Sequence, residues 1–168
     1  LINAVIKRDN QPEHSCFKAL TRSVATLAAL HELAKTPGAF NPIYEPANRI
    51  QKMLGRKNYN PSACTEKHPE SDPHNLISKS LFENDAEREL YDATVNLPDL
   101  PESGLTADWS AYFTAVGTLA PTVTAFFDQV MVNTGDRKQQ NRYNLLSLLN
   151  HHYNALADFT RISLTDDR

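Results

Sequence analysis

The sequence predicts an all-α fold, a single helical bundle of about five to six helices. Two observations favour this class. Apolar residues recur at spacings of three and four over most of the chain, as they do on the inward face of an amphipathic helix. No stretch of useful length alternates apolar and polar residues in the way of a half-buried strand. The 168 residues suffice for one hydrophobic core, so we expect residues 1–168 to form a single domain.

Two helices are expected in the first third of the chain. The first ends at Pro37-Gly38, a pair that stops helices, and its inward stripe comprises Phe17, Leu20, Val24, Leu27, Leu30 and Ala34. The second runs from Pro46 to Leu54, because proline suits a first helical position, where its missing N–H is not needed. Residues 57–73 contain three prolines and no apolar period, which predicts a proline-rich loop.

A third helix is expected to begin after Asn84. Asn84 is a good capping residue, and Glu87 follows three positions later, as in a capping box. The carboxylates from Glu83 to Asp92 have the pattern of a solvated face, because no apolar residues enclose them.

The last third of the chain has the most regular helical pattern. Thr106 is expected to cap a helix, and Pro121 to interrupt it and to open the next one, whose inward residues are Val123, Phe126, Phe127, Val130 and Met131. After a polar connection at 133–136, a final helix carries an apolar stripe at spacings of four and three: Leu145, Leu149, His152, Leu156 and Phe159. Such a stripe suits antiparallel packing against the preceding helices.

Charge is unevenly distributed along the chain, although the formal net charge is only −3. Residues 46–65 hold four basic residues and no Asp or Glu, whereas residues 66–108 hold eleven acidic and three basic residues. A polyanion would approach the first segment and avoid the second. The same distribution is also typical of ordinary solvated surface.

The motifs that catalysis requires are missing from the sequence. The five glycines are scattered singly, and no Gly-x-Ser-x-Gly element occurs. His151 and His152 are adjacent, so on a helix they point about 100° apart, and the other histidines lack a partner at metal-ligand spacing. No stretch approaches the roughly 18 apolar residues of a membrane span. We therefore expect a binding domain with no catalytic residue, metal, cofactor or membrane contact.

The segment from Pro121 to Phe159 carries a family resemblance. It reads PTVTAFFDQVMV, then NRYNLLSLL, then ADF. This resembles the C-terminal region of bacterial glycyl-tRNA synthetase β subunits, which is marked by a proline, Phe-Phe-Asp-x-Val-Met-Val, Asn-Arg, a leucine-rich helix and an Ala-Asp pair. The likeness is dense over residues 117–162 and patchy over residues 17–95.

The resemblance implies a helical anticodon-binding domain, of the type also found on arginyl-tRNA synthetases. Its implied partners are the anticodon arm of glycine tRNA, the α subunit that carries out aminoacylation, and the remainder of the β subunit. ATP and Mg²⁺ are then used by the whole glycine–tRNA ligase, and this fragment is non-catalytic alone. The chain starts at Leu1 rather than Met, so we expect a piece of a longer protein, in the cytoplasm or in an organelle of bacterial descent.

Lysine and arginine would hold the RNA backbone while polar and aromatic groups read unpaired bases. The expected RNA-binding residues are Arg49, Lys52, Arg56, Lys57, Arg137, Lys138, Asn141 and Arg142. Unpaired N–H groups in the first turn of the last helix would favour a phosphate there. Asp128 is also placed to pair with Arg142. The candidates for stacking on bases are Tyr59, Tyr143, His151 and Tyr153.

Three positions depart from the family pattern. Thr124 stands where an Asp is usual, the loop Asn133–Asp136 is shortened, and Gln139 and Gln140 replace positions that usually include an Arg.

A different class of function also fits the composition: a helical protein-interaction module that docks partner subunits or the rest of its own chain. The acidic third helix and the aromatic-rich fourth would suit that role.

Overall fold

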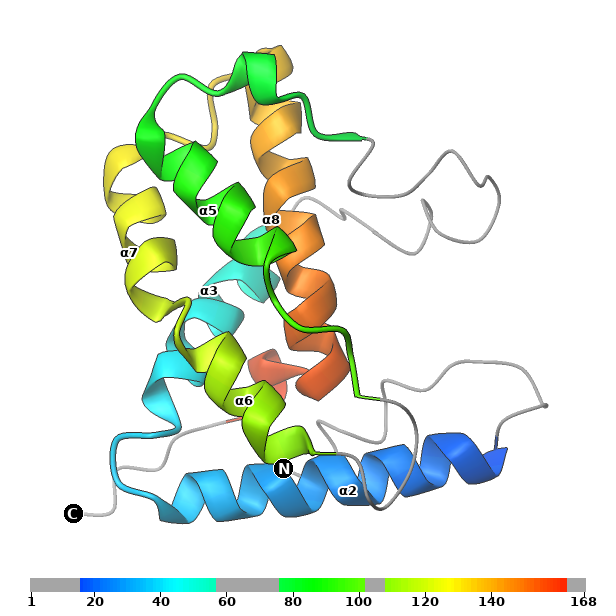
Figure 1. Ribbon diagram of the computed structural model, residues 1–168. Helices are drawn as coiled ribbons and strands as arrows, with labels where there is room; N and C mark the ends of the chain where they lie inside the picture. The colour runs from blue at the N-terminus through cyan, green and yellow to red at the C-terminus, as the bar shows by residue number, and fades with distance from the viewer. Residues whose placement is uncertain (1–15, 57–75, 102–107, 163–168) are drawn as a thin grey trace.

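The computed structural model confirms the all-α fold (Figure 1). It describes residues 16–56, 76–101 and 108–162, and no strand occurs within these ranges. The elements are α2 (Cys16–Lys35), α3 (Asn41–Arg56), the 3₁₀ turn η2 (Lys79–Leu81), α5 (Asp85–Val95), α6 (Trp109–Gly117), α7 (Ala120–Gln129), α8 (Arg137–Leu156) and the 3₁₀ turn η3 (Phe159–Arg161). The loop predicted at 57–73 lies outside the described residues.

Helix α8 is the centre of the bundle. Every residue from Asn141 to Asn150 is buried, so this helix has no solvent-facing side over about three turns. Helices α3, α5 and α6 pack on it, α7 packs against α5 and α3, and α2 lies across the base of the bundle against α6 (Figure 1). The rest of the fold is therefore arranged to cover α8.

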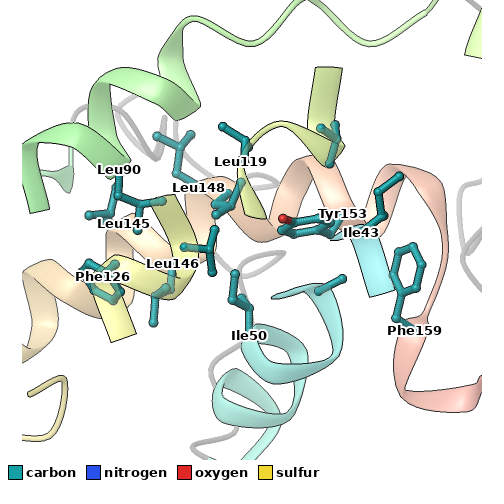
Figure 2. Close-up of a cluster of buried hydrophobic side chains, with 14 of the residues drawn as sticks. Ile43, Ile50, Leu90, Leu119, Phe126, Leu145, Leu146, Leu148, Tyr153 and Phe159 are labelled. Carbon is teal, nitrogen blue, oxygen red and sulfur yellow. The ribbon is translucent and has the colours of Figure 1, made fainter. Parts of the chain in front are cut away.

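The hydrophobic core forms where these helices meet (Figure 2). The apolar stripe predicted for the final helix is confirmed at Leu145, Leu149 and Leu156, all fully buried. Phe159 is buried as well, but it lies in η3, because the helix ends at Leu156. The facing helices contribute fully buried side chains that include Leu30, Ile43, Ile50, Leu90, Phe113 and Phe126.

The buried face of α2 is rotated from the predicted one. Leu30 is fully buried as expected, but Val24 is 51% exposed, while Ser23 and Thr26 are buried. The prediction that Val24 and Ala34 face inward is wrong, since α2 packs mainly on α6 and presents a narrow stripe to it. The side chains of Phe17 and Leu20 lie outside the described residues.

Helix α3 begins earlier than the sequence predicts. Gly38, at φ 76°, completes the predicted break after α2. The helix then starts at Asn41, and Pro46 lies inside it rather than at its first position. Proline removes one helical hydrogen bond, but burial of Phe40 and Ile43 stabilises the additional turn, so packing overrides the local preference.

The cap of α5 is the capping box that the sequence predicts. The Asn84 side chain accepts from the Glu87 N–H at 3.3 Å, and the Glu87 carboxylate accepts from the Asn84 N–H at 3.3 Å. The carboxylate face is not uniformly solvated, however, because Glu87 is fully buried. The prediction of a solvated face is therefore wrong for that residue.

Helices α6 and α7 follow the predicted pattern with two corrections. Asp108 caps α6, accepting from the Ala111 N–H at 2.9 Å, whereas the predicted cap Thr106 lies outside the described residues. Pro121 stands in the first turn of α7 as expected. The prediction that Met131 faces inward is wrong: α7 ends at Gln129 and the chain becomes extended, so neighbouring side chains alternate and Met131 is 74% exposed.

A buried ion pair ties α8 to α5. The Arg142 Nε donates to Glu87 Oε1 at 2.8 Å, and a terminal nitrogen of the same guanidinium donates to Glu83 Oε2 at 2.6 Å. A third bond, at 2.9 Å, goes to the Met131 carbonyl. Burial alone would lower the pKa of Arg142, but the bonds to Glu87 and Glu83 outweigh it, so its pKa is raised. The predicted pair of Asp128 with Arg142 is wrong, because Glu83 and Glu87 take that place.

Two asparagines of α8 hold the chain that leads into α5. The Asn141 side chain accepts from the Ser78 N–H at 2.7 Å and donates to the Ser78 carbonyl at 3.1 Å. Asn144 donates to the Leu76 carbonyl at 2.7 Å. These bonds satisfy backbone groups in a segment without regular helix, so polar residues on a buried helix act here as anchors.

We expect Arg142→Met to destabilise the domain by about 3–5 kcal/mol, because the substitution leaves the Glu87 carboxylate buried without its cation. Denaturant unfolding measures the loss. Arg161→Met is the matched control, since that guanidinium pairs with Asp158 on an exposed surface and should contribute little. Equal stability of the two variants would mean that the buried pair is not required.

Phe126 and Phe127 should differ in their contribution to stability. Phe126 is fully buried, so Phe126→Ala should cost about 3–5 kcal/mol, whereas Phe127 is only half-buried and Phe127→Ala should cost clearly less. Thermal melting of both variants tests the difference. A larger loss for Phe127→Ala would contradict this description of the core.

Candidate nucleic-acid interface

The expected RNA-binding residues fall into two groups in the structure. The first group lies on α3. Its buried stripe, which includes Ile43, Ala47 and Ile50, faces the core. Glu45, Arg49, Lys52 and Arg56 follow one another at spacings of four, three and four, which places them on the opposite face of the helix.

Along this α3 stripe, both Arg49 and Lys52 are exposed. The Arg49 guanidinium carbon lies 4.0 Å from the centre of the Phe127 ring on α7, a cation–π contact that also covers part of this aromatic residue. Arg56 is the last residue of α3, and its side chain lies outside the described residues, as does all of Lys57. The α3 stripe therefore begins with an acid and continues with cations.

The second group lies at the start of α8, where the structure uses most of the expected residues for internal contacts. Arg137 is exposed. Lys138 forms an ion pair with Glu83. The hydrogen bond to Lys138, and next the one to Arg142, lowers the pKa of Glu83, and the same pair raises the pKa of Lys138. Both groups thus stay charged and paired at neutral pH.

The expectation that Asn141 and Arg142 meet phosphate does not fit their surroundings. Their side chains are each about 3% exposed and bonded within the fold, to Ser78 and to the carboxylates of Glu83 and Glu87. A phosphate would have to displace these partners. Both residues fix the position of α5 instead.

The first N–H groups of α8 are also occupied. The Asp136 carboxylate accepts from the N–H groups of Lys138 and Gln139, both at 3.0 Å. A hydrogen bond from the Thr134 hydroxyl, and next the one from the Gln139 N–H, lowers the pKa of Asp136. The helix end is thus capped by a side-chain anion, and the expected docking of a phosphate on it is wrong for these two N–H groups.

The two groups occupy different levels of the bundle. Gln51 of α3 donates to Asn154 at 2.9 Å, near the far end of α8 from Arg137. Asn154 lies seventeen positions after Arg137 on the helix, a rise of about 25 Å. Figure 1 shows α8 starting at the top of the molecule, above the level of α3. The cations of α3 and Arg137 therefore do not form one compact patch.

Two of the expected stacking residues are unavailable to RNA. Tyr143 and Tyr153 are 4% and 0% exposed. His151 is exposed, and Tyr59 lies outside the described residues. The His152 Nδ1 lies 2.7 Å from the Tyr112 hydroxyl, and the described ranges contain no group of three potential metal ligands.

A cleft between α3 and α7 was not predicted from the sequence. Its volume is about 190 Å³, and it is lined by Asn41, Pro42, Glu45, Pro46, Arg49, Ala120, Val123, Thr124 and Phe127. The spacing of Glu45 and Arg49 predicts that they share a helix face, but their meeting with α7 depends on tertiary packing. Within the described residues, neither side chain forms an ion pair or hydrogen bond. The cleft therefore offers an unpaired carboxylate and an unpaired guanidinium.

No helix in the described parts of the chain is long and apolar enough to span a membrane.

Comparison with known proteins identifies relatives of one kind. The chain is 32% identical over 167 residues to the glycine–tRNA ligase β subunit of Picosynechococcus sp., covering 96% of this chain and 22% of that protein. The β subunit of Gloeothece citriformis is 30% identical over 172 residues, with 96% and 22% covered. That of Citrifermentans bemidjiense is 33% identical over 134 residues, with 74% and 20% covered. The chain thus spans about a fifth of the length of these curated relatives.

The model of the DALR anticodon binding domain matches residues 47–160, which run from the middle of α3 to η3. This stretch contains α8, the helices that cover it and the Arg142 ion pair, and it makes up well over half of the chain. The chain belongs to the DALR anticodon-binding domain family.

Proposed function

We propose that this domain binds the anticodon arm of glycine tRNA as part of a glycyl-tRNA synthetase β subunit. The observation that carries the proposal is the family match over residues 47–160, together with relatives named glycine–tRNA ligase β subunit. In this function the domain binds and positions RNA. Aminoacylation, with its ATP and Mg²⁺, takes place on the α subunit, in a cytoplasmic or organellar enzyme.

The α3 stripe supplies the electrostatic part of the proposed surface. Arg49 and Lys52 lie on it, Arg56 follows at helical spacing, and the described part of α3 beyond Glu45 carries no acid. Phosphate contacts of this kind position an RNA without reading its sequence. Arg137 is a separate exposed cation at the start of α8.

The acidic surface lies elsewhere on the bundle. Helix α5 carries the exposed acids Asp85, Glu89 and Asp92. It packs against α7 and α8 on the side nearer the viewer in Figure 1, whereas α3 lies behind. RNA that approached α3 would therefore avoid the strongest concentration of like charge.

Two exposed apolar side chains favour protein docking as a second candidate function. Val24 on α2 is 51% exposed, and Met131 after α7 is 74% exposed. Such residues suit contacts with the rest of the β subunit or with the α subunit. This role would add to RNA binding rather than replace it, because neither residue lies on the α3 stripe.

We expect Lys52→Glu to weaken binding of glycine tRNA by the full-length protein that carries this domain. Losing one phosphate contact should reduce the slope of log affinity against log salt by about 0.7–0.9. Binding titrations at several salt concentrations measure both quantities. Lys35→Glu, an equal charge reversal at an exposed position of α2, is the matched control and should behave like the parent.

If Lys52→Glu binds like the parent at every salt concentration, the α3 stripe does not contact phosphate. A parent affinity that scarcely responds to salt would instead support the protein-docking role, since apolar contacts are largely independent of ionic strength.

A further inference from the structure

The cleft between α3 and α7 combines a small volume with aromatic and proline walls. Pro42 and Pro46 line it from α3, and Thr124 and Phe127 from α7. A cavity of about 150 Å³ is enough to bind benzene, so a volume of about 190 Å³ admits one six-membered ring.

Two charged groups of opposite sign share this cleft. Glu45 and Arg49 are four residues apart on α3, which puts their Cβ atoms about 5–6 Å from each other. The Arg49 guanidinium lies over the Phe127 ring, and its N–H groups have no partner among the described residues. Such a pair on one helix face would ordinarily form a salt bridge, but here the two groups remain available to a ligand.

The donor and acceptor pattern of these two groups matches one pyrimidine. Cytosine presents an exocyclic amine beside two acceptors, the ring N3 and the O2 atom. A carboxylate accepts from the amine, and a guanidinium donates to N3 and O2 in the fork geometry that arginine provides. Uracil replaces the amine with a carbonyl oxygen, which would face the carboxylate without a hydrogen between them.

We propose that the α3–α7 cleft binds an unpaired cytosine of the anticodon, with Glu45 accepting from the base amine and Arg49 donating to N3 and O2. This inference rests on the proposed function, since a glycine anticodon ends in two cytosines. Lys52 lies next along the α3 stripe, so it is placed to hold a phosphate beside the bound base. Phosphate binding and base reading then belong to successive turns of one helix.

Glu45→Gln tests the base contact without removing a residue from the core, because Glu45 is exposed. A glutamine amide can either accept or donate, so it tolerates the cytosine amine and the uracil carbonyl alike. The experiment measures binding of the full-length protein to glycine tRNA and to transcripts in which each anticodon cytosine is replaced by uracil or by guanine. Glu89→Gln, an exposed acid on α5, is the matched control.

The parent and Glu89→Gln should prefer cytosine over uracil at one anticodon position by about tenfold or more. Glu45→Gln should lower that ratio without abolishing it, because Arg49 still faces the N3–H donor of uracil, and affinity for the unaltered tRNA should change less. Dimethyl sulfate, which methylates the N3 of exposed cytosines, gives a second readout. The parent should protect one anticodon cytosine, and Glu45→Gln should protect it less.

An unchanged cytosine preference in Glu45→Gln, with protection intact, would overturn the cleft assignment and leave the proposed function standing. Preference for guanine at that position would overturn the assignment as well, because guanine presents a different order of donors and acceptors from cytosine. Absence of salt-dependent tRNA binding by the parent would overturn the proposed function and this inference together.

Discussion

Complete burial of α8 is the constraint on which the rest of the structure depends. A helix that is covered on every side needs neighbours all around it, and α3, α5 and α6 provide them directly. The sequence of α8 is far from uniformly apolar, so its buried polar groups need partners inside the protein. Arg142 takes the carboxylates of α5, and Asn141 takes the backbone of Ser78. The polar residues of the central helix thus fix the position of α5 and of the segment that leads into it.

The basic residues of the domain fall into two groups: those paired with an acid inside the fold, and those exposed on the surface without an ion pair. Arg142 is held by Glu83 and Glu87, and Lys138 by Glu83, so the acids of the α5 region neutralise basic residues of α8. Arg49 and Lys52 of α3 form no ion pair among the described residues, although Glu45 lies four residues before Arg49. The uneven charge of the sequence therefore corresponds to two different surfaces. Around α5 and the start of α8, acids and bases neutralise each other, whereas the cations of the α3 stripe are open to a polyanion.

The helices were predictable from the sequence where local chemistry decides them. The Asn84–Glu87 box, the break at Gly38 and the leucine stripe of α8 all depend on residues close in sequence. Errors arose where tertiary packing decides. Pro46 sits inside α3 because Phe40 and Ile43 are buried, and Met131 turns outward because the chain becomes extended after Gln129. The roles of Arg142 and Asn141 were missed because their partners lie 55 to 63 residues away in sequence.

The candidate site was predictable to a similar extent. The helical spacing of Arg49 and Lys52 is enough to place both on one face, but only the packing of α7 against α3 brings Phe127 beneath the Arg49 guanidinium. That contact favours one arrangement of a long side chain before any ligand arrives, and a partly ordered donor loses less entropy on binding. A flexible cation elsewhere on the surface can attract RNA but cannot present a fixed hydrogen-bonding fork. Base discrimination therefore belongs in the α3–α7 cleft, whereas Lys52 and Arg137, exposed and without a partner that orders them in the described structure, are suited to the less directional task of holding phosphate.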